Sequence, residues 1–243
     1  MPKTSFGVEI EFSCQDCETF RMVRDSITEQ FGDRWEIGRD ASVSGKGTEL
    51  KTKGGHTIGA ILSDFKAISG LLAPLVKEAK VWIDSTAGLH IHLGIADWRL
   101  VELENFFNAM EAGMSDWLGF QPPSRTGNRF CHTDTTGNLY HELGQIEDHH
   151  KALNIGNALF NHNTIEIRIF ASTLQYYKLY NILNIVNQYI KQAVKIRRQR
   201  NTVATSSPHV LIKNKKLKKF MAERTKQLQP AYFHTIKTRL RAE

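Results

Sequence analysis

The sequence predicts an α+β protein in which an antiparallel sheet is backed by helices. Residues 6–13, 88–94 and 163–170 alternate apolar and polar side chains with the period of a β-strand. Longer segments, such as 18–31 and 174–200, repeat apolar residues at helical spacing. Because the strands are joined largely through hairpins, an antiparallel sheet is favoured over a parallel one.

The first half of the chain alternates strands and helices. After the strand at 6–13, the predicted elements are a helix at 18–31, a hairpin of 35–43 and 48–52, a helix at 57–79 and a short strand at 80–83. The hairpin is indicated by a Ser-Gly-Lys-Gly turn between its two strands. Pro74 is expected to mark a break or a new start in the helix, because proline removes a backbone donor.

The second half is predicted to continue this mixture and to end in a basic helix. The expected elements are the strand at 88–94, a helix at 97–118, loops over 119–137, strands at 153–160 and 163–170 that turn at Asn161-His162, a helix at 174–200, a polar linker at 201–208 and a helix at 213–228. We therefore expect one domain of residues 1–200 and a basic helical C-terminal segment of residues 201–243, which we expect to be an appendage.

Composition indicates a soluble globular protein. The 243 residues are 41% hydrophobic and 23% charged, and they hold only three cysteines. No stretch approaches the 18 or more consecutive apolar residues of a membrane span, and the N-terminal residues do not resemble a secretory signal. We expect a cytoplasmic protein without a membrane partner.

Positive charge is concentrated at the C-terminal end of the chain. The formal net charge is +7, but residues 195–243 hold 14 Lys and Arg against two acids, a local charge of +12. Residues 1–194 therefore carry −5. Such a basic segment predicts an anionic partner, such as a phosphate group, a nucleic acid or an acidic protein.

Three strands share one arrangement of ionisable residues. In each, two ionisable residues stand on either side of an isoleucine, so both point to one face of the sheet and the isoleucine points to the other. The pairs are Glu9 and Glu11, His90 and His92, and Glu166 and Arg168. Asp40 and Glu49, from the hairpin, are expected on the same face.

This face predicts a metal site that serves a phosphate. Carboxylates crowded together repel one another unless a cation lies among them. Oxygen-rich ligation suits Mg²⁺ or Mn²⁺, and one imidazole is compatible with either ion. Arginine beside such metals would stabilise charge on a phosphoryl group.

Five motifs, taken together and in order, resemble the amidoligase family. They are GVEIEF, GRDAS, ELKT, AGLHIHLG and TIEIRIFAST, and they span residues 6–173, roughly two thirds of the chain. The family is a branch of the glutamine synthetase and glutamate–cysteine ligase superfamily of carboxylate–amine ligases. The resemblance implies a curved antiparallel sheet of about six strands that forms a glutamine synthetase-like half-barrel.

The resemblance also implies a reaction and roles for individual residues. ATP would phosphorylate a carboxylate, and an amine would displace phosphate from the acyl phosphate to leave an amide. The implied metal ligands are Glu11 and Glu49 for one divalent ion, and Glu9, His90 and Glu166 for a second. The other implied roles are His92 facing the ATP phosphates, Arg168 stabilising the transferring phosphoryl group, Asp40 positioning the amine or accepting its proton, and Arg129 and Asn154 contacting substrate or nucleotide.

The leading hypothesis is therefore an ATP- and Mg²⁺-dependent (or Mn²⁺-dependent) carboxylate–amine ligase whose catalytic domain is residues 1–200. Its carboxylate could belong to an amino acid, a peptide or a protein. One alternative is a phosphotransferase that uses the same metal site. Another is a nucleic-acid-binding protein that acts through the basic C-terminal segment. The identity of both substrates and the oligomeric state are left open by the sequence.

Overall fold

Seven strands form one antiparallel sheet in the part of the chain that the structure describes. The structure is a computed structural model that describes residues 3–126, 131–133, 137–148, 150–196 and 203–240, apart from the side chains of residues 157, 203, 204 and 229–240. The strands are β1 (Ser5–Cys14), β2 (Trp35–Arg39), β3 (Lys46–Thr52), β4 (Val81–Trp82), β5 (Gly88–Gly94), β6 (Leu153–Asn154) and β7 (Thr164–Ala171). Their order is β2-β3-β1-β5-β7-β6, with β4 paired to the end of β1. The predicted α+β class and antiparallel sheet are confirmed.

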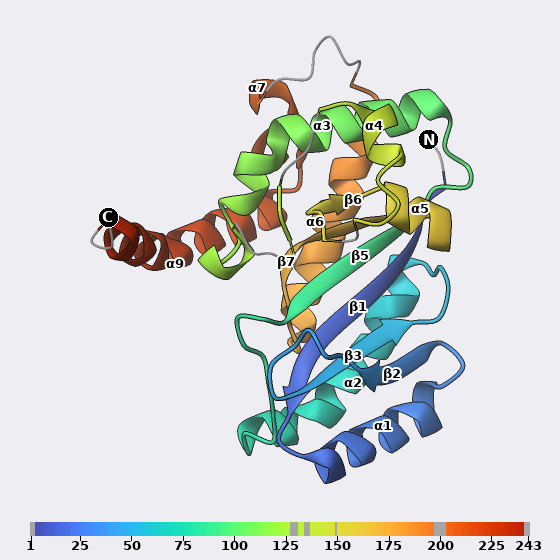
Figure 1. Ribbon diagram of the computed structural model, residues 1–243, viewed down its shortest axis with the longest axis vertical. Helices are drawn as coiled ribbons and strands as arrows, with labels where there is room; N and C mark the ends of the chain where they lie inside the picture. The colour runs from blue at the N-terminus through green and yellow to red at the C-terminus, as the bar shows by residue number, and fades with distance from the viewer. Residues whose placement is uncertain (1–2, 127–130, 134–136, 149, 197–202, 241–243) are drawn as a thin grey trace.

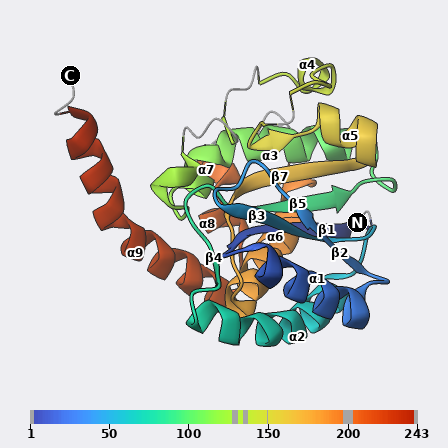
Figure 2. The same ribbon diagram turned by 60° about the horizontal axis from the view of Figure 1, so that its bottom comes forward.

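Helices cover the apolar face of this sheet, and two short helices lie on its other side. The longer helices are α1 (Cys17–Phe31), α2 (Ile58–Lys77), α3 (Leu100–Leu118), α6 (Tyr176–Ala193) and α9 (Lys215–Leu240). The short ones are η1 (Pro123–Arg125), α4 (Leu139–Leu143), α5 (Gly156–His162), α7 (Val203–Ser206) and α8 (Pro208–Leu211). Figures 1 and 2 show α1, α2 and α6 on one side of the sheet and α4 and α5 on the other.

The alternation of the three central strands separates an apolar face from a polar one. Ile10, Ile91 and Ile167, the central residues of the three motifs, are at most 1% exposed and belong to the hydrophobic core. Burying each such side chain contributes about 1.5–3 kcal/mol to folding. The same alternation therefore fixes the ionisable neighbours of these isoleucines on the opposite face.

Helix α2 is a core helix that continues through Pro74. The expected break at Pro74 is wrong. Proline has no N–H to donate to the carbonyl of Gly70, but both residues lie on the exposed side of the helix, so water can hydrogen-bond that carbonyl. Among the described residues, α2 alone is long and apolar enough to cross a membrane. However, its residues Phe65 and Ile68 are fully buried in the core, which accounts for its apolar character.

An ion pair joins α2 to the start of β2. The guanidinium of Arg34 donates to both carboxylate oxygens of Asp64, at 2.7 and 2.8 Å, and Trp35 Nε1 donates to the same carboxylate at 3.1 Å. The hydrogen bond from Arg34 holds the pKa of Asp64 below its usual value and outweighs the opposing effect of burial.

We expect Asp64→Asn to lower the free energy of unfolding by about 1 kcal/mol at pH 7, since it removes a charge-assisted pair that solvent screens on the half-exposed Arg34 side. A carboxylate whose pKa falls on folding stabilises the protein above its unfolded pKa, and this contribution is lost as the pH falls through the folded pKa. In urea titrations the difference from wild type should therefore shrink below about pH 4. Asp25→Asn, at an exposed pair, should change stability little at any pH.

The predicted hairpin at 153–170 is wrong in its first strand. Only Leu153–Asn154 pair with β7, and Gly156–His162 form α5. Asn154 Oδ1 accepts a hydrogen bond from Ala158 N at 3.3 Å, and Asn163 ends the helix in the left-handed conformation at φ +52°. The helix forms because local hydrogen bonds at both of its ends replace the strand pairing that the alternation suggested.

The beginning of the C-terminal segment packs into the core. Helix α6 ends at Ala193, before the predicted end at 200, and the predicted polar linker at 201–208 instead contains α7 and the start of α8. The side chains of Leu211, Ile212, Leu217 and Met221 are at most 7% exposed and contribute to the hydrophobic core. This arrangement differs from the expectation that residues 201–243 are an appendage. Helix α9 begins at Lys215, near the predicted start, but extends to Leu240, and its far end projects from the body of the molecule.

Candidate functional site

Two carboxylates and an imidazole meet at the centre of the polar face. Glu9, His90 and Glu166 come from β1, β5 and β7, and one potential ligand atom from each lies within 4.8 Å of the other two. His90 Nδ1 lies 3.0 Å from Glu9 Oε2 and 3.4 Å from Glu166 Oε1. The expectation that these residues share one face is confirmed. The cluster arises because Glu9 and His90 are direct partners in the β1–β5 register.

Two neighbouring side chains fix the orientation of Glu166. Arg168 Nη1 donates to Glu166 Oε1 at 2.6 Å, and Asn154 Nδ2 donates to Oε2 at 2.8 Å. Asn154 reaches this carboxylate because it is the register partner of Glu166. An irregularity in the β5–β7 pairing between Leu89 and Ile91 places an extra residue of β7 opposite His90, in the stretch that contains Arg168. Bulges of this kind re-aim side chains at functional sites.

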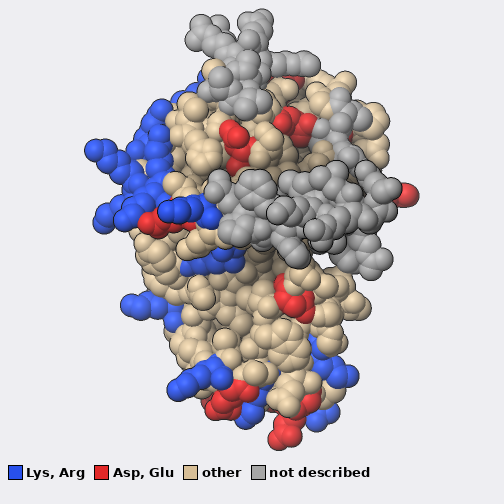
Figure 3. Space-filling view, turned by 90° about the vertical axis from the view of Figure 1, so that its left-hand side faces the viewer, with Lys and Arg blue, Asp and Glu red and all other residues tan. Residues whose placement is uncertain are grey.

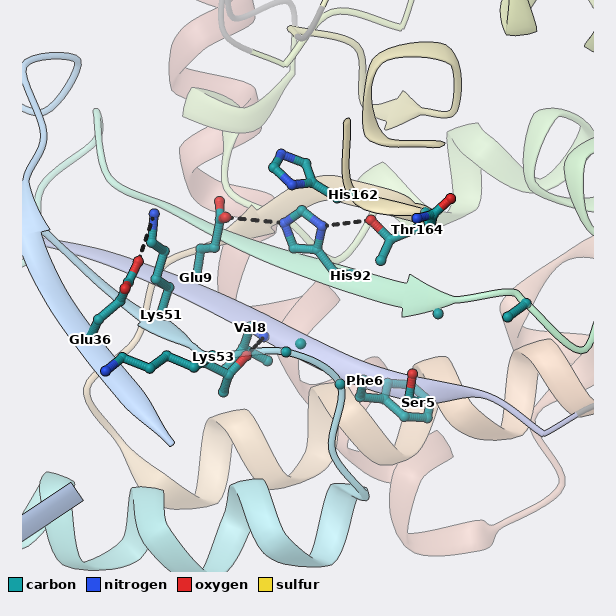
Figure 4. Close-up of a pocket in the computed structure, with 17 residues that line it drawn as sticks. Ser5, Phe6, Val8, Glu9, Glu36, Lys51, Lys53, His92, His162 and Thr164 are labelled. Carbon is teal, nitrogen blue, oxygen red and sulfur yellow. Dashed lines mark hydrogen bonds and ion pairs between the residues drawn. The ribbon is translucent and has the colours of Figure 1, made fainter. Parts of the chain in front are cut away.

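His92 links the cluster to an adjoining cavity. Its Nε2 lies 3.2 Å from Glu9 Oε1, and its Nδ1 is 3.1 Å from Thr164 Oγ1, as Figure 4 shows. Burial favours a lower pKa for His92, but the hydrogen bond and charge of Glu9 outweigh it and raise the pKa above the usual value. Burial likewise favours a higher pKa for Glu9, but the two histidines lower it below the usual range. The two histidines therefore favour the charged form of the Glu9 carboxylate.

The cavity beside His92 has a volume of about 510 Å³ and could hold a sizeable polar ligand. Its wall includes Lys51, Lys53 and His162, and Glu9 and His92 stand at its inner side. The chain around Gly54 and Gly55 forms another part of the wall. Basic side chains and exposed backbone beside a carboxylate cluster suit an anionic ligand that also carries a metal ion.

The two other predicted metal ligands have separate surroundings. Glu11 Oε1 lies 3.2 Å from His90 Nε2, and its Oε2 accepts a hydrogen bond from Gly88 N at 2.5 Å. Glu49 is the register partner of Glu11, and its carboxylate lies 3.3 Å from Lys51 Nζ. Burial and the charge of Glu9 raise the pKa of Glu49. Glu11 thus joins the cluster through His90, while Glu49 lies at its edge beside a lysine.

The remaining predicted site residues are Asp40 and Arg129. The Asp40 carboxylate accepts hydrogen bonds from the backbone and side chain of Ser42, at 2.8 and 2.7 Å, so it organises the turn that follows β2. Arg129 lies outside the described residues. The role of Asp40 with an amine and the role of Arg129 with a substrate or nucleotide stay predictions.

Arg125 is a residue of the site that the sequence did not indicate. It is 1% exposed, and its Nη2 donates to the carbonyl of Arg168 at 2.5 Å. A Cβ built on Gly88 would lie 2.9 Å from His90 Nε2 and 3.0 Å from Arg125 Nη2, so this guanidinium stands next to the cluster. Its Nε is buried without a hydrogen-bond partner among the described residues. A lone arginine in a segment predicted to be loop gives no periodic signal, so only the tertiary structure identifies it.

A side chain at position 88 would crowd the ends of the His90 and Arg125 side chains. We expect Gly88→Ala to weaken Mn²⁺ binding by at least about tenfold, since the new methyl group must displace His90 or Arg125. Gly38→Ala, on β2, is the matched control because its Cβ would meet nothing within 4 Å. Titration of Mn²⁺, followed by electron paramagnetic resonance, measures the Mn²⁺ affinity of both variants. Unchanged affinity in Gly88→Ala would place the bound ion away from His90.

The donor set fits a divalent metal that prefers oxygen ligands. Two carboxylates and one imidazole already lie together, with Glu166 held by Asn154 and Arg168, and these are the kinds of ligand that Mg²⁺ and Mn²⁺ accept. We expect Glu166→Gln to weaken Mn²⁺ binding by about 100-fold or more, because it removes a charged ligand from the centre of the cluster. Glu36→Gln, on the cavity wall outside the cluster, should leave the affinity within about twofold. Equal losses in both variants would indicate diffuse attraction of the ion to acidic residues.

No protein-family model and no curated protein sequence matches this chain. The site must therefore be interpreted from its own chemistry and from the motif resemblance.

Proposed function

We propose that this protein is an ATP-dependent carboxylate–amine ligase that uses a divalent metal ion, Mg²⁺ or Mn²⁺. The observation that carries the proposal is the cluster of Glu9, His90 and Glu166 with Arg168 bound to Glu166 at 2.6 Å, on an open sheet face beside a large cavity. Metal ligands next to a guanidinium are the arrangement that phosphoryl transfer needs. The resemblance of the motifs to the amidoligase family supports the same proposal.

The residues of the chain divide the work of binding and orientation. Glu9, His90 and Glu166 would hold the metal ion, which when bound would neutralise phosphate charge. Arg168, which is bound to Glu166, would contact a phosphoryl oxygen carried by that metal ion. His92, at the inner side of the cavity, would place a positive charge near a nucleotide phosphate, because its raised pKa favours the protonated form and both ring nitrogens stay on Glu9 and Thr164.

The proposed reaction has two balanced steps. A substrate carboxylate oxygen forms a bond to the γ-phosphorus of ATP as the bond to ADP breaks, which gives an acyl phosphate. The amine nitrogen then forms a bond to the acyl carbon, the bond to the phosphate oxygen breaks, and inorganic phosphate leaves. The nitrogen loses a proton in this second step, so a base is needed near the amine.

The experiment that tests this proposal is ADP release with Mg²⁺, ATP and hydroxylamine, assayed against amino acids and short peptides with free carboxylates. Hydroxylamine traps an acyl phosphate as a hydroxamate, which gives a coloured complex with ferric iron. We expect carboxylate-dependent ADP release and an equal amount of hydroxamate, both absent in Glu166→Gln.

A phosphotransferase that uses the same site is the second candidate, because metal and arginine alone would serve it equally well. With a guanidino group as acceptor it would release ADP and form a phosphorylated product without hydroxamate. With a carboxylate as acceptor it would also give hydroxamate, but it would form no amide when an amine replaces hydroxylamine. Either result would replace the ligase with the phosphotransferase. ADP release that is unchanged in Glu166→Gln would contradict both.

A further inference from the structure

A groove lies between α6 and α9, on the helical side of the sheet and away from the carboxylate cluster. Asn214 N, just before α9, donates to Gln188 Oε1 at 3.3 Å, and Arg224 lies close enough to Lys178 to help lower the pKa of Lys178, after burial, to about 8. Thus the first turns of α9 run antiparallel to α6. The groove between them has a volume of about 320 Å³.

The α6 side of this groove is aromatic at one end and amide-rich at the other. Tyr177 and Tyr180 are 67% and 41% exposed, and their rings lie parallel, at 9° with centroids 6.4 Å apart. Asn184 and Gln188 follow at helical spacing along the same side of α6 and also line the groove. Two flat rings left exposed side by side gain little for folding, because burial is what makes an aromatic side chain stabilising.

The α9 side of the groove is basic. Lys216 lines the groove, and Lys215, Lys218 and Lys219 are exposed on the same first turns of α9. The nearest acid in sequence, Glu223, is 3.7 Å from Lys219. Figure 3 shows Lys and Arg gathered on the side of the molecule from which α9 projects. The groove therefore combines a positive wall with an aromatic one.

This combination distinguishes among three kinds of occupant. An amphipathic helix needs a wall of apolar side chains, but among the described residues that line this groove only Leu217 is aliphatic. An acidic protein surface would use the lysines but has no use for two exposed parallel rings. A single-stranded nucleic acid uses both, since its bases stack on aromatic rings and its phosphates pair with lysines.

We infer that this tyrosine–lysine groove, formed by Tyr177, Tyr180, Asn184 and Gln188 of α6 and Lys216 of α9, binds single-stranded nucleic acid. The bases stack on the two tyrosines, and the phosphates follow the lysines of α9. From Tyr177 to Gln188 the helix is roughly 16 Å long, which gives room for on the order of four nucleotides. Because the site lies on the helical side of the sheet, it is independent of the proposed ligase chemistry.

The test is fluorescence anisotropy of a labelled 12-nucleotide oligo(dT) with the full chain, at 50 to 300 mM KCl. Removal of each ring should weaken binding about 5- to 100-fold, so the Tyr177→Ala/Tyr180→Ala variant should lose the product of two such factors. Its salt dependence should stay that of wild type. Tyr140→Ala, at a tyrosine that is 61% exposed on α4, is the matched control and should bind like wild type. Lys216→Gln should weaken binding and reduce the slope against salt by about one phosphate contact.

Three results would overturn the inference. The first is an absence of binding by wild type at 50 mM KCl. The second is a tyrosine double variant that binds within twofold of wild type while Lys216→Gln is weakened, because this pattern indicates general attraction to polyanions. The third is binding to duplex DNA, or competition by heparin or poly-glutamate, as strong as binding to the single strand. Circular dichroism and Mn²⁺ titration of each variant establish that the fold and the metal cluster are intact, whatever the outcome of the ligase assay.

Discussion

Replacing Arg168 by lysine is expected to reduce turnover by about 1,000-fold while ATP affinity changes by less than about fivefold. Lysine keeps the charge but lacks the planar fork that can hold Glu166 and a phosphoryl oxygen at the same time. The contact matters most when charge develops on the transferring group, so the loss falls on kcat rather than on substrate binding. ADP release with hydroxylamine measures turnover, and equilibrium dialysis with ATP and Mg²⁺ measures affinity.

The Arg168 result must be separated from damage to the metal cluster, because Arg168 also orients Glu166. Mn²⁺ titration of the Arg168→Lys variant provides that separation, and we expect less than a tenfold change. Arg99→Lys, at an exposed arginine that pairs with Glu102 on α3, is the control for loss of an arginine and should have wild-type turnover. If ATP affinity falls as much as the rate, Arg168 is a nucleotide-binding residue. If Mn²⁺ affinity falls as much as the rate, its role is to position Glu166.

A chain that ends at residue 201 is expected to lose most or all of its stability. The deletion removes Leu211, Ile212, Leu217 and Met221, which are buried against the body. At about 1.5–3 kcal/mol for each buried side chain, this amounts to roughly 6–12 kcal/mol, comparable with the 5–15 kcal/mol that stabilises a typical domain. It also exposes Tyr189, whose hydroxyl lies 2.9 Å from the carbonyl of Ser206. Thermal unfolding by circular dichroism and yield of soluble protein measure the effect.

A chain that ends at residue 228 is the matched control. It keeps Met221 and every other buried residue described in this segment, so we expect a melting temperature within a few degrees of the full chain. A soluble 1–201 protein with wild-type unfolding and Mn²⁺ binding would show that residues 1–200 fold as an independent domain and that the rest is an appendage.

The sequence by itself determined the sheet and the face on which its ionisable residues lie. In β1, β5 and β7 the period of two leaves no choice, since burying Ile10, Ile91 and Ile167 commits their neighbours to the other face. Glu9, His90 and Glu166 could therefore be grouped before their strands were known to be adjacent. The same reasoning failed at 153–160, where a short alternating pattern fitted a strand but capping hydrogen bonds favoured a helix.

Only the tertiary structure decided which residues complete the site and how the chain ends. Arg125 comes from the three-residue helix η1, which has no periodic pattern, and its place beside Gly88 depends on the packing of η1 against β7. The orientation of Glu166 depends on Asn154, which reaches it through strand pairing between segments 12 residues apart. Helix α9 is basic in sequence, and the apolar residues of α8 and α9 become core residues because these helices pack against α3 and α6. Local pattern fixes which way a side chain points along its own element, whereas contacts between distant segments depend on how those elements pack, and a single sequence carries no local signal for that packing.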